Sequence, residues 1–168
     1  MNRKMMILGI AVVAVLVVAL APVVSTVPAQ GAGIVASATG SGQFTSGGEW
    51  RTFSFTAQKD SSNISTGQAE LHSRSADLRV HIEIDCLQVV GNTATMSGSV
   101  TLDNMNGAFV GDPIWFRVVD NGSGANSPPD LISRVSFFSG PGLLCTDDGY
   151  PPNNPANIPI EAGNVTVH

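Results

Sequence analysis

The ten residues Asp77–Cys86 alternate strictly between polar and apolar side chains. Every even position from 78 to 84 is apolar, and every odd position from 77 to 85 is charged or polar. Because successive side chains of a strand point to opposite faces, this pattern predicts a β-strand with one face in a core and the other in water. A fold built on such a strand needs further strands to cover its apolar face.

Other segments of the chain show the same alternation. Turns rich in Gly, Asn, Ser and Pro separate them, and helical periodicity is absent after the N-terminal region. We therefore expect an all-β fold, an antiparallel β-sandwich or small barrel of about eight strands, formed by a single domain over residues 39–168. The expected strands are 39–45, 49–59, 64–72, 77–86, 93–102, 114–119, 131–138 and 163–168.

The segments 64–72 and 77–86 are expected to pair as an antiparallel hairpin. Placing Leu71 beside Leu78 puts Glu70 opposite Arg79. A cross-strand pair of opposite charges contributes a fraction of a kcal/mol and helps to fix the register.

The N-terminus has the three parts of a secretory signal peptide. Arg3 and Lys4 precede an apolar run from Met5 to Ala21, and Val27-Pro28-Ala29 provides small residues for cleavage. Residues 1–29 are thus predicted to be a signal helix that is removed, and 30–38 a flexible N-terminal segment. The alternative is a leader kept as a membrane anchor, because the apolar run is close to the minimum length of a membrane span.

Export of this chain leaves an acidic protein. Without Arg3 and Lys4, six basic residues face thirteen acidic ones, a net charge of −7. This charge argues against nucleic acid and anionic membranes as partners, so a membrane is expected to be contacted only through the leader before cleavage.

Cys86 and Cys145 are the two cysteines of the chain. An even number of cysteines in an oxidising compartment predicts a disulfide, and the alternative is two buried free thiols. The chain lacks the histidine spacing of a zinc site, a Gly-x-Ser-x-Gly elbow and a phosphate-binding glycine loop.

The segment 120–130 is the candidate metal site. Asp120, Asn121 and Asp130 offer oxygen ligands of the kind that calcium selects. Their spacing differs from that of an EF-hand, and Asn121-Gly122 is also an ordinary turn pair, so the alternative is a plain connecting loop. No other cofactor is expected.

Two further surfaces are candidate sites. The outer face of the 64–86 hairpin should carry carboxylates and imidazoles, which suit either acid–base chemistry or a solvated strand face; its members are Glu70, His72, His81, Glu83 and Asp85. Trp115 and Arg117 share one side of another strand. They form a binding patch if that side is exposed and belong to the core if it is covered.

Several short segments occur together in an order that resembles a known family. They are Gly40-Ser41-Gly42, Phe53-x-Phe55-x-Ala57-x-x-Asp60, Val80-His81, the run from Asp85 to Ala94, Val119-Asp120-Asn121-Gly122 and the closing run from Gly163 to His168. Across nearly the whole chain after the leader, they resemble the post-COAP domains, which are small secreted bacterial β-domains. The resemblance implies an extracellular β-rich module and supplies no catalytic residues.

Together these features predict a secreted extracellular or cell-envelope module that binds or has a structural role without catalysis. Its partner is expected to be a cell surface, a carbohydrate or a protein. The alternative is a secreted hydrolase that uses the carboxylate- and histidine-bearing face of the 64–86 hairpin.

Overall fold

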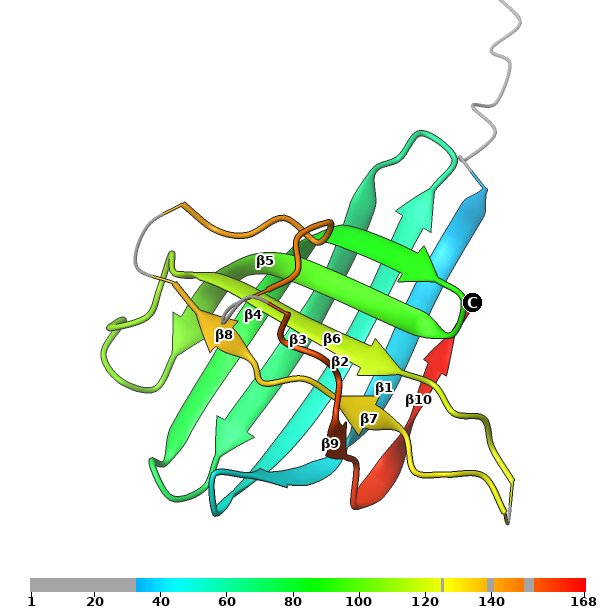
Figure 1. Ribbon diagram of the computed structural model, residues 1–168. Coiled ribbons are helices and arrows are strands. Elements are labelled where there is room, and N and C mark those ends of the chain that lie inside the picture. Colours follow the sequence, from blue (N-terminus) through cyan, green and yellow to red (C-terminus); the bar gives the residue numbers. More distant parts are fainter. Residues whose placement is uncertain (1–32, 125, 139–140, 150–152) are drawn as a thin grey trace, which may run out of the picture. The chain divides into compact units, whose positions relative to one another are not determined.

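The computed structural model describes residues 33–124, 126–138, 141–149 and 153–168. The predicted signal helix, residues 1–29, lies outside the described residues. Within them the chain contains strands and no helix, and the strands form one curled antiparallel sheet (Figure 1). The all-β, antiparallel prediction is confirmed.

Ten strands make up this sheet among the described residues. They are β1 (Ile34–Ser46), β2 (Glu49–Asp60), β3 (Ser65–Ser73), β4 (Leu78–Val90), β5 (Thr93–Asp103), β6 (Pro113–Val119), β7 (Leu131–Ile132), β8 (Ser136–Phe137), β9 (Ile158–Pro159) and β10 (Ala162–Val167). Their order is β10-β1-β2-β3-β4-β5-β6-β7-β9, and β8 also pairs with β6. The segment predicted as one strand over 131–138 forms the two short strands β7 and β8.

A β-bulge in β4 marks where the sheet turns from one layer to the next. Ile84 pairs with Gly98 and Cys86 with Ser97, so Asp85 is an extra residue on β4. Pairing with β3 ends at Ile84, whereas pairing with β5 continues to Val90. Because a bulge bends its strand and increases the local twist, the ends of β4 and β5 swing over, and with β6 they form a second layer (Figure 1).

The bulge also reverses which side chains of β4 face inward. Before it the even positions Val80, Ile82 and Ile84 are buried; after it Leu87 is buried instead. Cys86 therefore leaves the core face on which strict alternation would place it. Gly98 lies opposite the bulge, where an added Cβ would collide with the carbonyl oxygen of Glu83.

The core lies between the two layers and is continuous across them. Phe55 of β2 contacts Phe116 of β6 edge-on, with 5.6 Å between the ring centroids. Phe44 and Phe53 extend this row of rings toward one end of the sheet. The remaining large, fully buried apolar side chains include Ile84, Leu87, Met96, Ile114, Ile132, Val80, Val100, Val118 and Val165.

The C-terminal residues connect the two ends of the sheet. β9 pairs with β7, and β10, only two residues further on, pairs with β1. The last residue is also held, because His168 and Ser37 exchange backbone hydrogen bonds of 2.8 and 2.9 Å. β9 and β10, which stand at opposite ends of the strand order, are thus connected by only two residues.

Two sequence predictions about strand pairing are wrong in detail. Residues 34–38, predicted to be flexible, belong to β1: they pair with β2, and Ala38 is fully buried. The four-residue loop of the 64–86 hairpin comprises residues 74–77, one position later than expected, so Leu71 pairs with Val80 and not with Leu78. Glu70 therefore lies opposite His81, and Arg79 lies opposite His72.

Asp103 organises the connection between β5 and β6. Its Oδ1 accepts hydrogen bonds from the backbone N–H groups of Met105 and Gly107, and its Oδ2 accepts one of 2.7 Å from Phe109. The N–H of Phe109, followed by those of Gly107 and Met105, holds the pKa of Asp103 below its ordinary value, although desolvation acts in the opposite direction.

This geometry predicts an acid-sensitive loop. A lowered folded-state pKa gives stability that is present above the unfolded pKa, about 4, and is lost as the pH falls through the folded pKa. We expect the amide proton of Phe109 to lose protection from exchange below about pH 4. Asp103→Asn should remove that protection already at neutral pH, because an amide group has one oxygen acceptor in place of two. Equal protection of Phe109 in the variant and the parent, measured by NMR, would contradict this assignment.

Candidate functional site

The outer face of the first layer carries hydroxyl and amide side chains. On β2 the odd positions Phe53, Phe55 and Ala57 point into the core. The intervening residues, Ser54 and Thr56 among them, consequently point outward and are exposed. Aliphatic side chains are absent from these outward positions of β2, so this face offers hydrogen-bond donors and acceptors.

The neighbouring strands continue this polar face in register. Gln68 of β3 lies between Thr56 of β2 and Glu83 of β4. One step along the strands, Glu70 lies between Ser54 and His81 in the same way. Directly paired residues have Cβ atoms about 5 Å apart, so each row presents a continuous line of polar groups.

This face is hollowed into an open groove of about 870 Å³. The groove crosses β2, β3, β4 and β5, a width of about 15 Å at the usual strand spacing. The outward side chains that line it are Ser54, Thr56, Gln58, Thr66, Gln68, Glu70, His81, Glu83 and Thr101. The groove therefore has room for an extended ligand.

The charged groups of the groove are two carboxylates and one imidazole. His81 Nδ1 lies 4.0 Å from Glu70 Oε2, and the two side chains are 50% and 47% exposed. That distance is longer than a hydrogen bond, and both side chains are about half exposed, so a ligand in the groove can reach both groups. Among the described residues, no Lys or Arg lines the groove. Its electrostatic potential therefore favours neutral or positively charged ligands.

The structure brings together three of the five residues predicted for the outer face of the hairpin. Glu70, His81 and Glu83 line the groove, whereas His72 and Asp85 do not. His72 lies beyond its end, with Nε2 3.9 Å from Asp77 Oδ1.

The structure gives the candidate calcium ligands Asp120 and Asp130 another role. Asp130 is 6% exposed, and its two oxygens accept hydrogen bonds from the backbone N–H groups of Asn121 and Val165, at 2.8 and 2.7 Å. Asp120 accepts from Gly122 and Val167 in the same way. Both carboxylates thereby bond the free edge of β10 and fasten the connection between β6 and β7 to it.

Asn121 uses its side chain within the same loop. Its Nδ2 donates to the carbonyl oxygen of Pro129 at 2.7 Å. In the described part of the chain, no group of three or more His, Cys, Asp or Glu residues is arranged to hold a metal ion. The calcium site stays a prediction from the sequence.

Trp115 is fully buried, so it does not form an exposed patch with Arg117. Its neighbours Ile114 and Phe116 face the core, and Trp115 faces the opposite side of β6. There Gly149 packs so closely on the indole that an added Cβ would collide with it. Arg117 lies over the ring, 5.0 Å from its centroid, and donates to Thr95 Oγ1. Of the two alternatives for Trp115, the covered position is correct.

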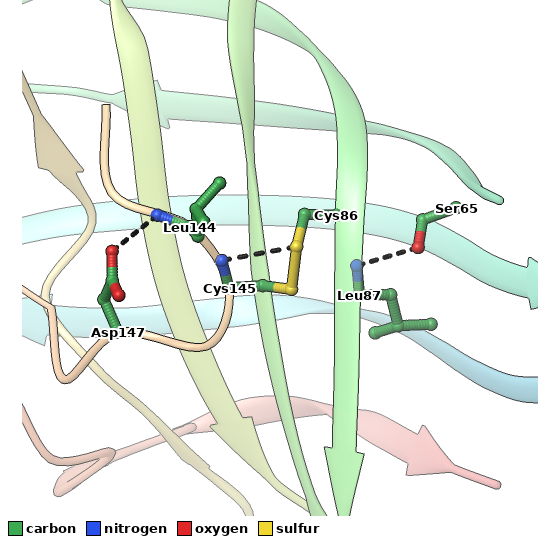
Figure 2. Close-up of a disulfide and its surroundings, with 6 residues drawn as sticks. All are labelled: Ser65, Cys86, Leu87, Leu144, Cys145 and Asp147. Carbon is green, nitrogen blue, oxygen red and sulfur yellow. Dashed lines mark hydrogen bonds between the residues drawn. A yellow bond between two sulfur atoms is a disulfide. The ribbon is translucent and has the colours of Figure 1, made fainter. Parts of the chain in front are cut away.

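A disulfide fastens the segment that covers Trp115. Cys86 and Cys145 are bonded, with their Cα atoms 5.5 Å apart, as predicted (Figure 2). The backbone N–H of Cys145 also lies 3.3 Å from Cys86 Sγ, and that of Leu144 donates to Asp147 Oδ2. Since Cys86 follows the bulge, its side chain points away from the core toward this segment.

The contribution of β2 to the groove was not predicted. Ser54 and Thr56 are not among the candidate site residues identified from the sequence. The available signal was their alternation with buried aromatic residues, together with the hydroxyl and amide groups at matching positions of the next strand. What the sequence did not contain is the curvature that turns this face into a groove.

No protein-family model, curated protein or solved structure matches the chain.

Proposed function

We propose that the protein is an exported, non-catalytic binding module that holds a carbohydrate chain in the groove across β2–β5. The observation that carries this proposal is the lining of the groove: hydroxyl, amide and carboxylate groups from adjacent strands converge on an open hollow of about 870 Å³. Such groups match the hydroxyl groups of a sugar polymer, and ligand sites are typically of this volume.

Two features support action outside the cell. The N-terminal residues have the composition of a signal peptide, and the disulfide between Cys86 and Cys145 is typical of an oxidising compartment. Among the described residues, no helix is long and apolar enough to cross a membrane. The resemblance to post-COAP domains supports the same setting and a bacterial source.

The charge of the groove narrows the class of carbohydrate. Glu70 and Glu83 lie on adjacent strands, and no Lys or Arg among the described lining residues offsets their charge. Polysaccharides that carry carboxylate or sulfate groups would be repelled. We therefore propose a neutral polymer or, with electrostatic attraction added, one that contains free amino sugars.

The second candidate function is hydrolysis of a glycosidic bond by Glu70 and Glu83. Diagonal neighbours on adjacent strands have Cα atoms about 7–8 Å apart, so their carboxyl groups can reach the separation of about 6.5–9.5 Å that inverting pairs use. However, an acid catalyst needs an environment that raises its pKa, usually burial. Glu70 is about half exposed in an open groove, so binding is the better supported function.

Neutralising the groove should weaken binding of cationic oligosaccharides. We expect Glu70→Gln combined with Glu83→Gln to raise the Kd for chitosan oligosaccharides about three- to tenfold, because each exposed charge pair contributes 0.2–1 kcal/mol. Isothermal titration calorimetry measures this change. Glu161→Gln is the matched control, because Glu161 is exposed between β9 and β10, away from the groove. An unchanged Kd in the double variant would show that the two carboxylates do not contribute to binding. Cleavage of the oligosaccharide by the parent protein would favour the hydrolase.

A further inference from the structure

A second hollow lies outside the groove, beside the turn between β1 and β2. It has a volume of about 410 Å³ and is open to solvent. Three separate parts of the chain form it: the β1–β2 turn, the residues between β7 and β8, and the segment just before β9. Its polar members are Thr45, Ser46, Arg134, Asn153, Asn154 and Asn157.

The chemistry of this hollow differs from that of the groove in the sign of its charge. Arg134 is exposed, and none of the ion pairs between described residues includes it. No Asp or Glu in the described part of the chain lines the hollow. The other polar groups are amides and hydroxyls, which donate hydrogen bonds without adding negative charge. In a protein with an excess of acidic residues, this is a local positive site.

Hydrogen bonds between different parts of the chain hold the walls of the hollow in place. Asn154 is 5% exposed, and its Nδ2 donates a hydrogen bond of 3.0 Å to the carbonyl oxygen of Arg134. Its backbone N–H donates to the carbonyl oxygen of Asp148. Next to it, Asn153 has a φ of 60°. The contact between Asn154 and Arg134 fixes two walls of the hollow relative to each other.

We propose that this hollow binds the oxyanion group of a small acidic ligand, with Arg134 as its cationic partner. A guanidinium group binds carboxylate, sulfate or phosphate through paired, charge-assisted hydrogen bonds, and the surrounding amides supply further donors. The volume suits a ligand of about the size of a single sugar acid. This site is independent of the groove, whose carboxylates favour ligands of the opposite charge.

An NMR titration tests the proposal on protein exported and purified after expression of the full chain. The probes are phosphate, sulfate and glucuronate, each added at constant ionic strength with chloride as the balancing anion. We expect saturable shifts of the backbone amides of Gly47, Asn154 and Asn157 with at least one probe. The probe that binds most tightly distinguishes a carboxylate from a tetrahedral oxyanion.

Three variants decide the role of Arg134. Arg134→Gln should weaken binding at least about tenfold, the effect of losing a charged hydrogen-bond partner. Asn157→Asp, which adds a carboxylate at an exposed position of the hollow, should weaken it similarly while Arg134 is kept. Arg79→Gln, at an exposed arginine outside the hollow, should leave binding unchanged.

The proposal is overturned by the absence of saturable shifts with all three probes. Binding by Arg134→Gln within twofold of the parent would also overturn it. The same holds if Arg79→Gln weakens binding as strongly as Arg134→Gln, because the effect would then be one of overall charge.

Discussion

Replacing both Cys86 and Cys145 by serine is expected to lower the free energy of unfolding by about 4 kcal/mol, the chain-entropy value for closing a loop of this length. The two residues are separated by 59 positions, so the bond restricts much of the unfolded chain. In a domain of this size the change corresponds to a decrease in Tm of about 15 °C. The disulfide also holds the segment that packs on Trp115.

Thermal unfolding followed by circular dichroism measures this loss, and tryptophan fluorescence reports the local effect. If the covering segment detaches, water reaches Trp115 and its emission moves to longer wavelength. Reduction of the parent protein by a thiol reagent is the matched control and should reproduce the behaviour of the double variant. A decrease in stability below about 1 kcal/mol would show that the bond is incidental to the fold.

Asp130→Ala is expected to have the second large effect, a loss of about 3–5 kcal/mol of unfolding free energy. Its carboxylate accepts hydrogen bonds from the N–H groups of Asn121 and Val165, and Val165 is fully buried. Hydrogen bonds to charged groups contribute about 1.5–3 kcal/mol each, and a buried N–H left without a partner costs a similar amount. The variant should also release β10 from the connection between β6 and β7.

Chemical denaturation gives the unfolding free energy, and amide exchange at Val165 reports the release of β10. Asp148→Ala is the control, since Asp148 is exposed and no side-chain hydrogen bond of this residue is found among the described contacts. Asp130→Asn keeps one acceptor and should fall between the parent and Asp130→Ala. If Asp130→Ala is as stable as the control, the Asp130 carboxylate does not stabilise the contact between β10 and the β6–β7 connection.

The alternation of residues 77–86 correctly predicted a half-buried strand, and comparable patterns located most of the sheet. Alternation failed at Asp85, because a bulge residue looks like any other outward position in the sequence. This extra residue directs the Cys86 side chain away from the core, and it bends β4 so that the end of the strand joins the second layer. A period of two residues contains no information on where a strand gains an extra residue.

The strand at the N-terminus escaped prediction for a different reason. Ile34 and Val35 favour a strand, but they follow a Gly/Ala-rich stretch, and the small residues 36–38 have little intrinsic preference for one. The segment is extended because β2 and His168 provide hydrogen-bond partners. The predicted hairpin register is off by two residues because the four-residue loop begins one position later than expected. A shift of two keeps every side chain on its predicted face, so Glu70, His81 and Glu83 still share the outer face.

The charged members of the candidate site were predictable, but its hydroxyl and amide members and its shape were not. The outward carboxylates and histidine of the hairpin were identified, but the groove also depends on sheet curvature, which arises from strand number and the bulge. In the same way, Asp120 and Asp130 were identified as oxygen donors. That these oxygens bond to the edge of β10 depends on contacts with residues about 35 to 47 positions away.

The most direct test of the groove as the binding surface is an NMR titration of the exported protein with chitosan oligosaccharides, with alginate oligosaccharides as the anionic comparison. The proposal predicts saturable shifts of the amides of Thr56, Gln68 and Glu83 with the cationic chain and none with the anionic one. Shifts confined to other faces, or equal shifts with both chains, would contradict it.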